Sequence, residues 1–234
     1  MASLLAGAAG AGPWPRGQGE AFLSLSAERD RAGHGYAGIY GEYGWTGRTT
    51  LGVELGRADR GEVSALVWMQ RALDDGSGPN RIALSWGGGA ISRDGVLVPV
   101  GIAGASWGRG LDGIALFRGI RDGGWISLDA RIKVTGEIDA VAMRDGPADA
   151  PYLAYLTPEW SAKLDAALGL RPWSGWMVIN QLRLEERKDT GLSARLAGSV
   201  VRDIGGPAKL ELGVVAPLSG PGEWAVKLGT WLEF

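Results

Sequence analysis

The chain of 234 residues contains no cysteine and only one histidine, His34. The lack of cysteine excludes disulfides, thiolate metal sites and cysteine nucleophiles. A single histidine argues against a histidine-based metal site and against a Ser-His-Asp triad. The formal net charge of −2 creates no broad basic field that would attract nucleic acid. We therefore expect no metal, no cofactor, no catalytic residue and no nucleic-acid partner.

The sequence also lacks any run of about 18 consecutive apolar residues, which is the length that a transmembrane helix needs. A β-barrel that crosses a membrane shows the same absence, because its strands alternate apolar and polar residues. Two residue types are abundant instead. The chain has 40 Gly, far above the usual share of about 7%, and 11 Trp. Glycine suits turns and close backbone approach, and tryptophan is enriched at membrane interfaces.

Alternation of apolar and polar residues runs through most of the chain after residue 20. In WISLDARIKV, residues 125–134, Leu128 and Ile132 share one face while Asp129 and Arg131 share the other. Turn compositions such as DDGSGPN and SGPG separate such segments. The candidate strands are residues 20–28, 36–45, 49–56, 62–72, 81–91, 96–107, 113–120, 125–134, 161–171, 176–185, 193–203, 209–216 and 223–234.

Single-chain bacterial membrane barrels have even strand numbers, so one of these thirteen candidates is wrong or one more strand exists. The weakest candidate is 113–120, and the longest connection, 135–159, is either a short hairpin or a surface loop. We interpret the charged run LEERKD, 184–189, as a solvated turn. The sequence predicts an all-β fold, an antiparallel up-and-down transmembrane β-barrel of about twelve strands, with fourteen as the alternative.

The polar face of the predicted strands mixes Gly, Ala and Ser with charges of both signs, which suits a confined polar lumen better than a fully solvated surface. Such a set would line a weakly charge-selective pore or form an ion-paired plug that fills the barrel, and the sequence leaves both open. The predicted lumen-lining residues are Glu54, Asp129, Arg131, Lys133, Lys163, Asp165, Arg171, Arg195, Lys209, Glu211 and Lys227.

Several tryptophans fall at the ends of predicted strands, where an aromatic girdle at a membrane interface would place them. The alternative is that they plug the ends of a soluble barrel. The predicted girdle consists of Trp45, Trp107, Trp125, Trp160, Trp173 and Trp176.

The chain begins with small apolar residues that include Ala9-Gly10-Ala11, an A-x-A cleavage pattern. We interpret residues 1–11 as the remnant of a signal peptide, 12–19 as a periplasmic N-terminal segment and 20–234 as the barrel. The run lacks a positively charged start, and a flexible leader is the alternative.

The last segment, EWAVKLGTWLEF, resembles the carboxy-terminal assembly signal of Gram-negative outer-membrane β-barrel proteins. The residues that carry this resemblance are Val226, Leu228, Thr230, Leu232 and Phe234. It implies location in the bacterial outer membrane, contact with outer-membrane lipid, and recognition by the barrel-assembly machinery. Three longer stretches, GPWPRGQGEAFLSLS, TPEWSAKLDAALGLRPWSGWMVINQ and SARLAGSVVRDIGGPAKLELGV, resemble small proteobacterial outer-membrane barrels of the transporter type.

The function expected from these features is a passive, porin-like channel or transporter for small solutes, without enzymatic activity. The first alternative is a structural outer-membrane barrel whose lumen is filled by side chains. An outer-membrane hydrolase that uses His34 with Asp30, and a soluble barrel that binds an apolar ligand, are further alternatives.

Overall fold

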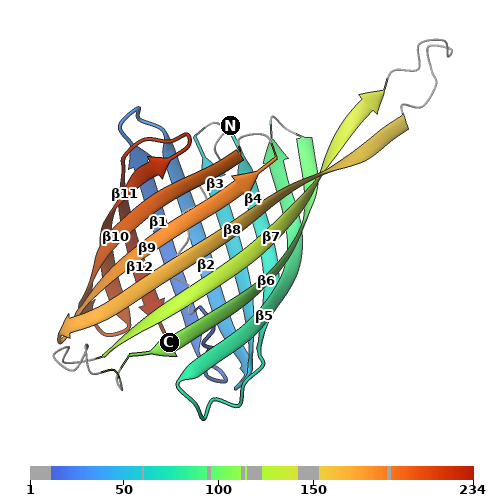
Figure 1. Cartoon of the computed structure of the whole chain (residues 1–234). Helices are drawn as coiled ribbons and strands as arrows, with labels where there is room; N and C mark the ends of the chain where they lie inside the picture. The colour runs from blue at the N-terminus through green and yellow to red at the C-terminus, as the bar shows by residue number, and fades with distance from the viewer. Residues whose placement is uncertain are drawn as a thin grey trace.

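The computed structural model describes residues 12–59, 61–93, 96–111, 114, 123–141, 153–188 and 191–234. These residues form a closed barrel of twelve antiparallel strands in which every strand pairs with its neighbours in the sequence and β1 pairs with β12 (Figure 1). The strands are β1 Ala21–Asp30, β2 Gly35–Thr46, β3 Thr49–Ala58, β4 Val63–Ala72, β5 Asn80–Arg93, β6 Val96–Gly110, β7 Gly124–Val141, β8 Leu153–Trp173, β9 Trp176–Arg187, β10 Gly191–Gly205, β11 Ala208–Ser219 and β12 Ala225–Glu233.

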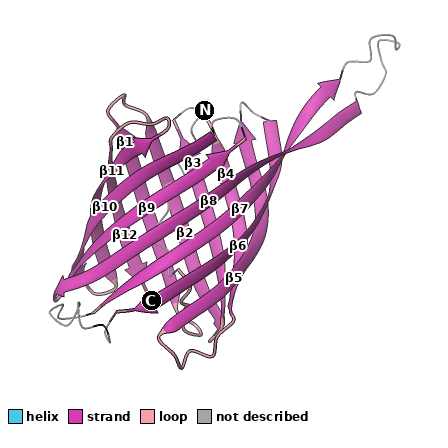
Figure 2. Cartoon of the chain, viewed as in Figure 1, coloured by secondary structure: helices cyan, strands magenta, loops and turns pink. Residues whose placement is uncertain are grey.

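The predicted all-β, up-and-down fold of twelve strands is confirmed (Figure 2). None of the described residues forms a helix that is long and apolar enough to cross a membrane. The weakest candidate strand, 113–120, falls outside the described residues except for Ile114, which lies in no strand. The predicted signal remnant, 1–11, also lies outside them.

The connection expected over 135–159 is largely strand. The ladder between β7 and β8 continues from the pair Thr135 and Glu159 to the pair Val141 and Leu153. The two strands twist out past the rim of the barrel as a two-stranded arm (Figure 1). The expectation of a solvated turn at 184–189 is wrong for residues 184–187, because β9 runs on to Arg187.

Large apolar side chains point outward from the barrel, as the alternation predicts for a membrane barrel. Val67 in the middle of β4 is 64% exposed and Leu212 on β11 is 58% exposed. A continuous exposed apolar surface of this kind is rare on a soluble monomer. Charged residues that face outward from the described strands all lie within three residues of a strand end: Arg29, Arg57, Arg71, Arg109, Glu186 and Arg202.

The first and last strands close the barrel. β1 and β12 pair from Phe22 with Glu233 to Asp30 with Ala225. Beyond the ladder, the Ala21 amide donates to the Phe234 carbonyl at 3.0 Å and the Phe234 amide donates to the Ala21 carbonyl at 2.9 Å. We call the rim that holds Ala21 and Phe234 the proximal rim, and the opposite rim the distal rim.

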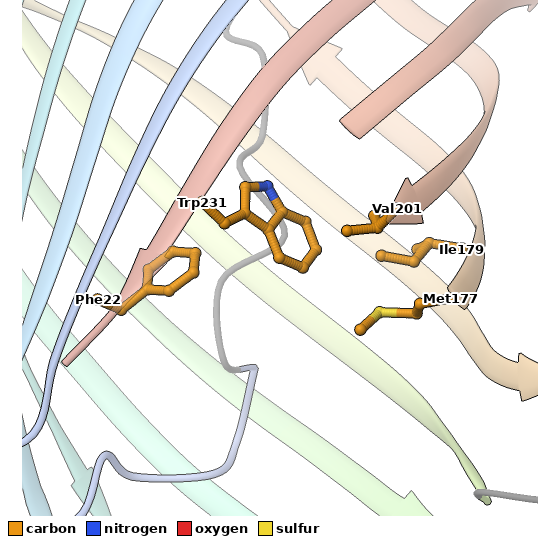
Figure 3. Close-up of a cluster of buried hydrophobic side chains, with 5 residues drawn as sticks. All are labelled: Phe22, Met177, Ile179, Val201 and Trp231. Atoms are coloured by element: carbon orange, nitrogen blue, oxygen red, sulfur yellow. The ribbon is translucent and has the colours of Figure 1, made fainter. Parts of the chain in front are cut away.

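Apolar side chains also pack inside the barrel, beside the small and charged residues predicted for the lumen. Near the proximal rim, residues of four strands form a buried cluster, the proximal cluster (Figure 3), which consists of Phe22, Met177, Ile179, Val201 and Trp231. A second buried cluster lines the β4–β6 wall and consists of Leu66, Trp68, Ile91, Val100 and Ile102. The two clusters meet at Tyr40, which packs against both.

Candidate functional site

The barrel encloses an elongated cavity of about 570 Å³, which is the candidate functional site. Tyr36 and Ser193, near the distal rim, line the same cavity as Lys209 and Glu233, near the proximal rim. The cavity therefore follows the barrel from one rim to the other. This volume accommodates a small organic solute.

Most of the predicted lumen residues contribute to the cavity wall. These are Glu54, Asp129, Arg131, Lys133, Lys163, Asp165, Arg171, Arg195 and Lys209. The other two, Glu211 and Lys227, face inward but are buried beneath the surface of the wall. Their carboxylate and ammonium groups are 2.9 Å apart, and the Trp231 indole donates to the second Glu211 oxygen at 3.0 Å.

Two ion pairs connect strands that are not neighbours in the barrel. Arg131 on β7 lies 3.3 Å from Glu54 on β3. Arg183 on β9 lies 3.8 Å from Glu28 on β1. In each case the two strands are four places apart around the ring. The lumen is therefore narrow enough for side chains to meet across it.

Three charged lumen residues at the distal end of β9 were not predicted from the sequence: Arg183, Glu185 and Arg187. Glu185 accepts from Arg187 at 2.7 Å and lies 3.8 Å from Lys163. The signal was available, because these residues continue the alternation of β9 at every second position. The many charged residues at positions 183–189 obscured this alternation.

Residues 12–17, which we call the entry segment, lie inside the barrel and line the cavity through Gly12, Trp14 and Arg16. Arg16 Nε is 2.5 Å from Glu42 Oε2. The sequence analysis gave no reason to expect this placement for the segment 12–19. Its predicted position on the periplasmic side of a membrane stays a prediction.

Large lumen-facing rings lie over glycines of neighbouring strands. A Cβ atom added to Gly52 would lie 2.0 Å from the indole of Trp68, and one added to Gly169 would lie 2.1 Å from the indole of Trp125. Neither position has room for a side chain while the ring stays in place. The abundance of both glycine and tryptophan in this chain follows in part from this packing.

Replacing Gly52 by valine is expected to destabilise the barrel by about 1–3 kcal/mol, because the side chain would overlap the indole of Trp68. Gly101→Val is the matched control, since a Cβ at Gly101 meets nothing within 4 Å. Urea unfolding of the refolded barrel, followed by tryptophan fluorescence, gives both values. Equal midpoints for the two variants would contradict the packing argument.

Five of the six predicted girdle tryptophans face outward from the barrel, and Trp125 does not. Trp45 and Trp173 are well exposed near the proximal rim, and Trp176 lies there beneath the guanidinium of Arg202. Trp125 points inward, lines the cavity and packs against the proximal cluster. The girdle prediction is therefore wrong for Trp125, because its position at a strand end gave no information about its face. Contact of the other five, including Trp107 and Trp160, with a membrane stays a prediction.

His34 occupies the turn between β1 and β2. Its Nδ1 lies 3.0 Å from Asp30 Oδ2, and its backbone amide donates to Asp30 Oδ1 at 2.8 Å. Asp30 thus holds the turn through both contacts. His34 is not among the residues that line the cavity, and its contacts with Asp30 lie in a rim turn.

Several solved outer-membrane porins and channels have a similar fold. The KdgM porin in complex with disordered oligogalacturonate is 10% identical, with 91% of this chain and 99% of that chain covered and a TM-score of 0.59. The NanC porin is 10% identical, with 90% and 98% covered and a TM-score of 0.57. An outer membrane channel from Pseudomonas putida F1 is 9% identical, with 94% and 97% covered and a TM-score of 0.56. No protein-family model and no curated protein matches the chain.

Proposed function

We propose that this protein is a passive, non-catalytic channel for small solutes in the bacterial outer membrane. The observation that carries the proposal is a cavity whose wall includes residues near both rims. A channel needs a polar path of this kind through an otherwise apolar layer. Known proteins of the same fold include a porin bound to oligogalacturonate and an outer membrane channel, which supports the same role here.

The proposed location rests on the outer surface of the barrel. Exposed apolar side chains cover it between the rims, and outward-facing charges are confined to strand ends among the described residues. A closed barrel satisfies all backbone hydrogen bonds of its strands, which lipid requires. The proposed partners are outer-membrane lipid, the barrel-assembly machinery and a small-molecule substrate.

Conductance across a planar lipid bilayer tests the proposed function. The purified barrel, refolded in detergent and shown intact by heat-modifiable migration on a gel, should give discrete and steady ion steps. Silence from an intact barrel would contradict the proposal. A heat-denatured sample is the control for leakage caused by detergent.

The ion pairs across the lumen favour one alternative, a structural barrel that conducts nothing. Arg131 with Glu54 and Arg183 with Glu28 each connect strands four places apart around the wall, as a filled lumen would require. Measuring conductance at several salt concentrations separates the two functions, because salt screens charge pairs that solvent reaches, such as Arg131 with Glu54. Conductance that rises faster than bulk conductivity with salt favours a channel with ion pairs in its path, and silence at every salt concentration favours the structural barrel.

Deletion of Phe234 is expected to reduce assembly into the outer membrane by about tenfold or more, if the terminal ring is read as an assembly signal. Deletion also removes two backbone hydrogen bonds to Ala21, so it affects stability as well. Phe234→Ala keeps those backbone groups and removes only the ring. The fraction of protein in the outer membrane of an expressing bacterium measures both effects.

The signal interpretation requires that Phe234→Ala assemble poorly and that Phe234→Tyr assemble normally. If the alanine variant assembles as well as the parent while the deletion does not, the terminus matters only for closing the barrel.

A further inference from the structure

We propose that the entry segment, residues 12–17, is a movable gate that sets the open cross-section of the channel. The inference rests on the proposed function, since a gate has a role only in a barrel that conducts. The segment lines the cavity, so any movement of it changes the width of the path. Three features support the proposal: how the segment is held, how the wall is shaped beneath it, and where its one charge lies.

The entry segment is the part of the lumen that can move without opening the sheet. It belongs to none of the twelve strands. Its contacts are made largely with side chains of the wall: Gln70 Nε2 donates to the Gly12 carbonyl at 2.9 Å, and the Arg16 amide donates to Thr50 Oγ1 at 2.9 Å. Segments held in this way open at a lower free energy than strands within a closed ladder.

The barrel wall has two glycines beneath the segment. A Cβ at Gly44 would lie 1.9 Å from the carbonyl oxygen of Gly17. A Cβ at Gly108 would lie 2.6 Å from the ring of Pro13 and 2.5 Å from that of Trp14. Any other residue at either position would displace the segment, so the wall is shaped to receive it.

A buried ion pair holds the segment in place and acts as its latch. The Arg16 guanidinium is 2.5 Å from Glu42, whose side chain is almost fully buried. It also lies over the ring of Phe22, 4.4 Å from the ring centroid. Tyr40 donates a hydrogen bond to the other Glu42 oxygen. Removing one partner of a buried pair leaves an uncompensated charge, so the pair strongly favours the closed position.

Single-channel recording of latch variants tests the gate. Arg16→Gln should raise the ratio of time spent in the larger-conductance state to time spent in the smaller by about tenfold, which corresponds to about 1.4 kcal/mol. Deletion of residues 12–17 should leave only the larger state. Arg81→Gln is the control, because it also removes one cation and breaks an ion pair, the 3.6 Å contact with Asp74, at a residue outside the cavity wall. Its open-to-closed ratio should match that of the parent.

A reversible covalent lock tests the same point independently, because the chain has no cysteine to interfere. Gly12→Cys combined with Ser127→Cys places two thiols between the segment and the wall, because a Cβ at Gly12 would lie 3.6 Å from Ser127 Cβ, a separation that suits a disulfide. The oxidised protein should show only the smaller conductance, and a reductant should restore the larger one. The two single variants control for folding.

The outcomes separate the gate from the proposed channel. If the parent conducts but Arg16→Gln, the deletion and the oxidised lock all behave like it, the gate is overturned and the channel stands. If the parent and the deletion are both silent as intact barrels, the channel and its gate are both overturned.

Discussion

Lys227→Met is expected to reduce the free energy of unfolding by about 3–5 kcal/mol, the usual cost of leaving one charge of a buried pair without its partner. The Lys227 ammonium is 2.9 Å from the Glu211 carboxylate, and both side chains are almost fully buried. Methionine keeps most of the volume of lysine, so the loss reports the missing charge and not a cavity. The midpoint and slope of urea unfolding in detergent or vesicles measure it.

Two further variants distinguish this explanation from a general loss of packing. Lys209→Met breaks a solvent-accessible pair with Glu233 and should cost less than about 1 kcal/mol. Adding Glu211→Gln to Lys227→Met should recover much of the loss, because the uncompensated charge disappears and the amide still accepts from Trp231. The charge explanation fails if Lys227→Met is no more harmful than Lys209→Met, or if the second substitution recovers nothing.

Val67→Arg is expected to destabilise the membrane-inserted barrel by about 2–4 kcal/mol and to lower the yield of assembled protein. Val67 is the most central outward residue of β4 and is 64% exposed. In a bilayer this position lies in the hydrocarbon, where a guanidinium loses most of its hydration. Reversible unfolding from vesicles gives the free energy, and outer-membrane fractionation gives the yield.

Val63→Arg provides the matched control, because Val63 faces the same way from the distal end of the same strand. Near the interface arginine reaches the headgroups, and the cost falls to about 0–1 kcal/mol. Equal effects at both positions would mean that the depth in a membrane plays no part, which would contradict the proposed location. In detergent-free buffer, a soluble barrel would tolerate both substitutions.

The strand pattern was predictable because one physical fact governs it. Each strand separates an apolar outside from a polar or tightly packed inside, so the period of two appears in the sequence wherever the barrel continues. Twelve of the thirteen candidate strands match observed strands for this reason. The inward direction of Glu54, Lys133 and Lys163 followed from the same period.

Features that depend on tertiary contact were not predictable from that period. Trp125 and Trp173 both lie at the ends of strands. Only the three-dimensional structure shows that the Trp125 ring lies over Gly169 inside the barrel, whereas the Trp173 ring faces outward. Arg16 precedes the first strand in a stretch rich in Gly and Pro, with no alternation to assign it a side. Arg16 contacts Glu42, which lies far along the chain, and no local sequence pattern predicts that contact.

The ladder between β1 and β12 has a consequence for the order in which the barrel can form. Eleven ladders join consecutive strands, so they can arise from local hairpins before the ring closes. The twelfth joins Phe22 to Glu233, across nearly the whole chain. Until it forms, both β1 and β12 present open edges that can pair with other chains. Closing so long a loop also carries the largest entropic cost of any ladder here. Pairing of β12 with β1 therefore completes the ring, and the barrel is most exposed to aggregation in the stage before this ladder forms.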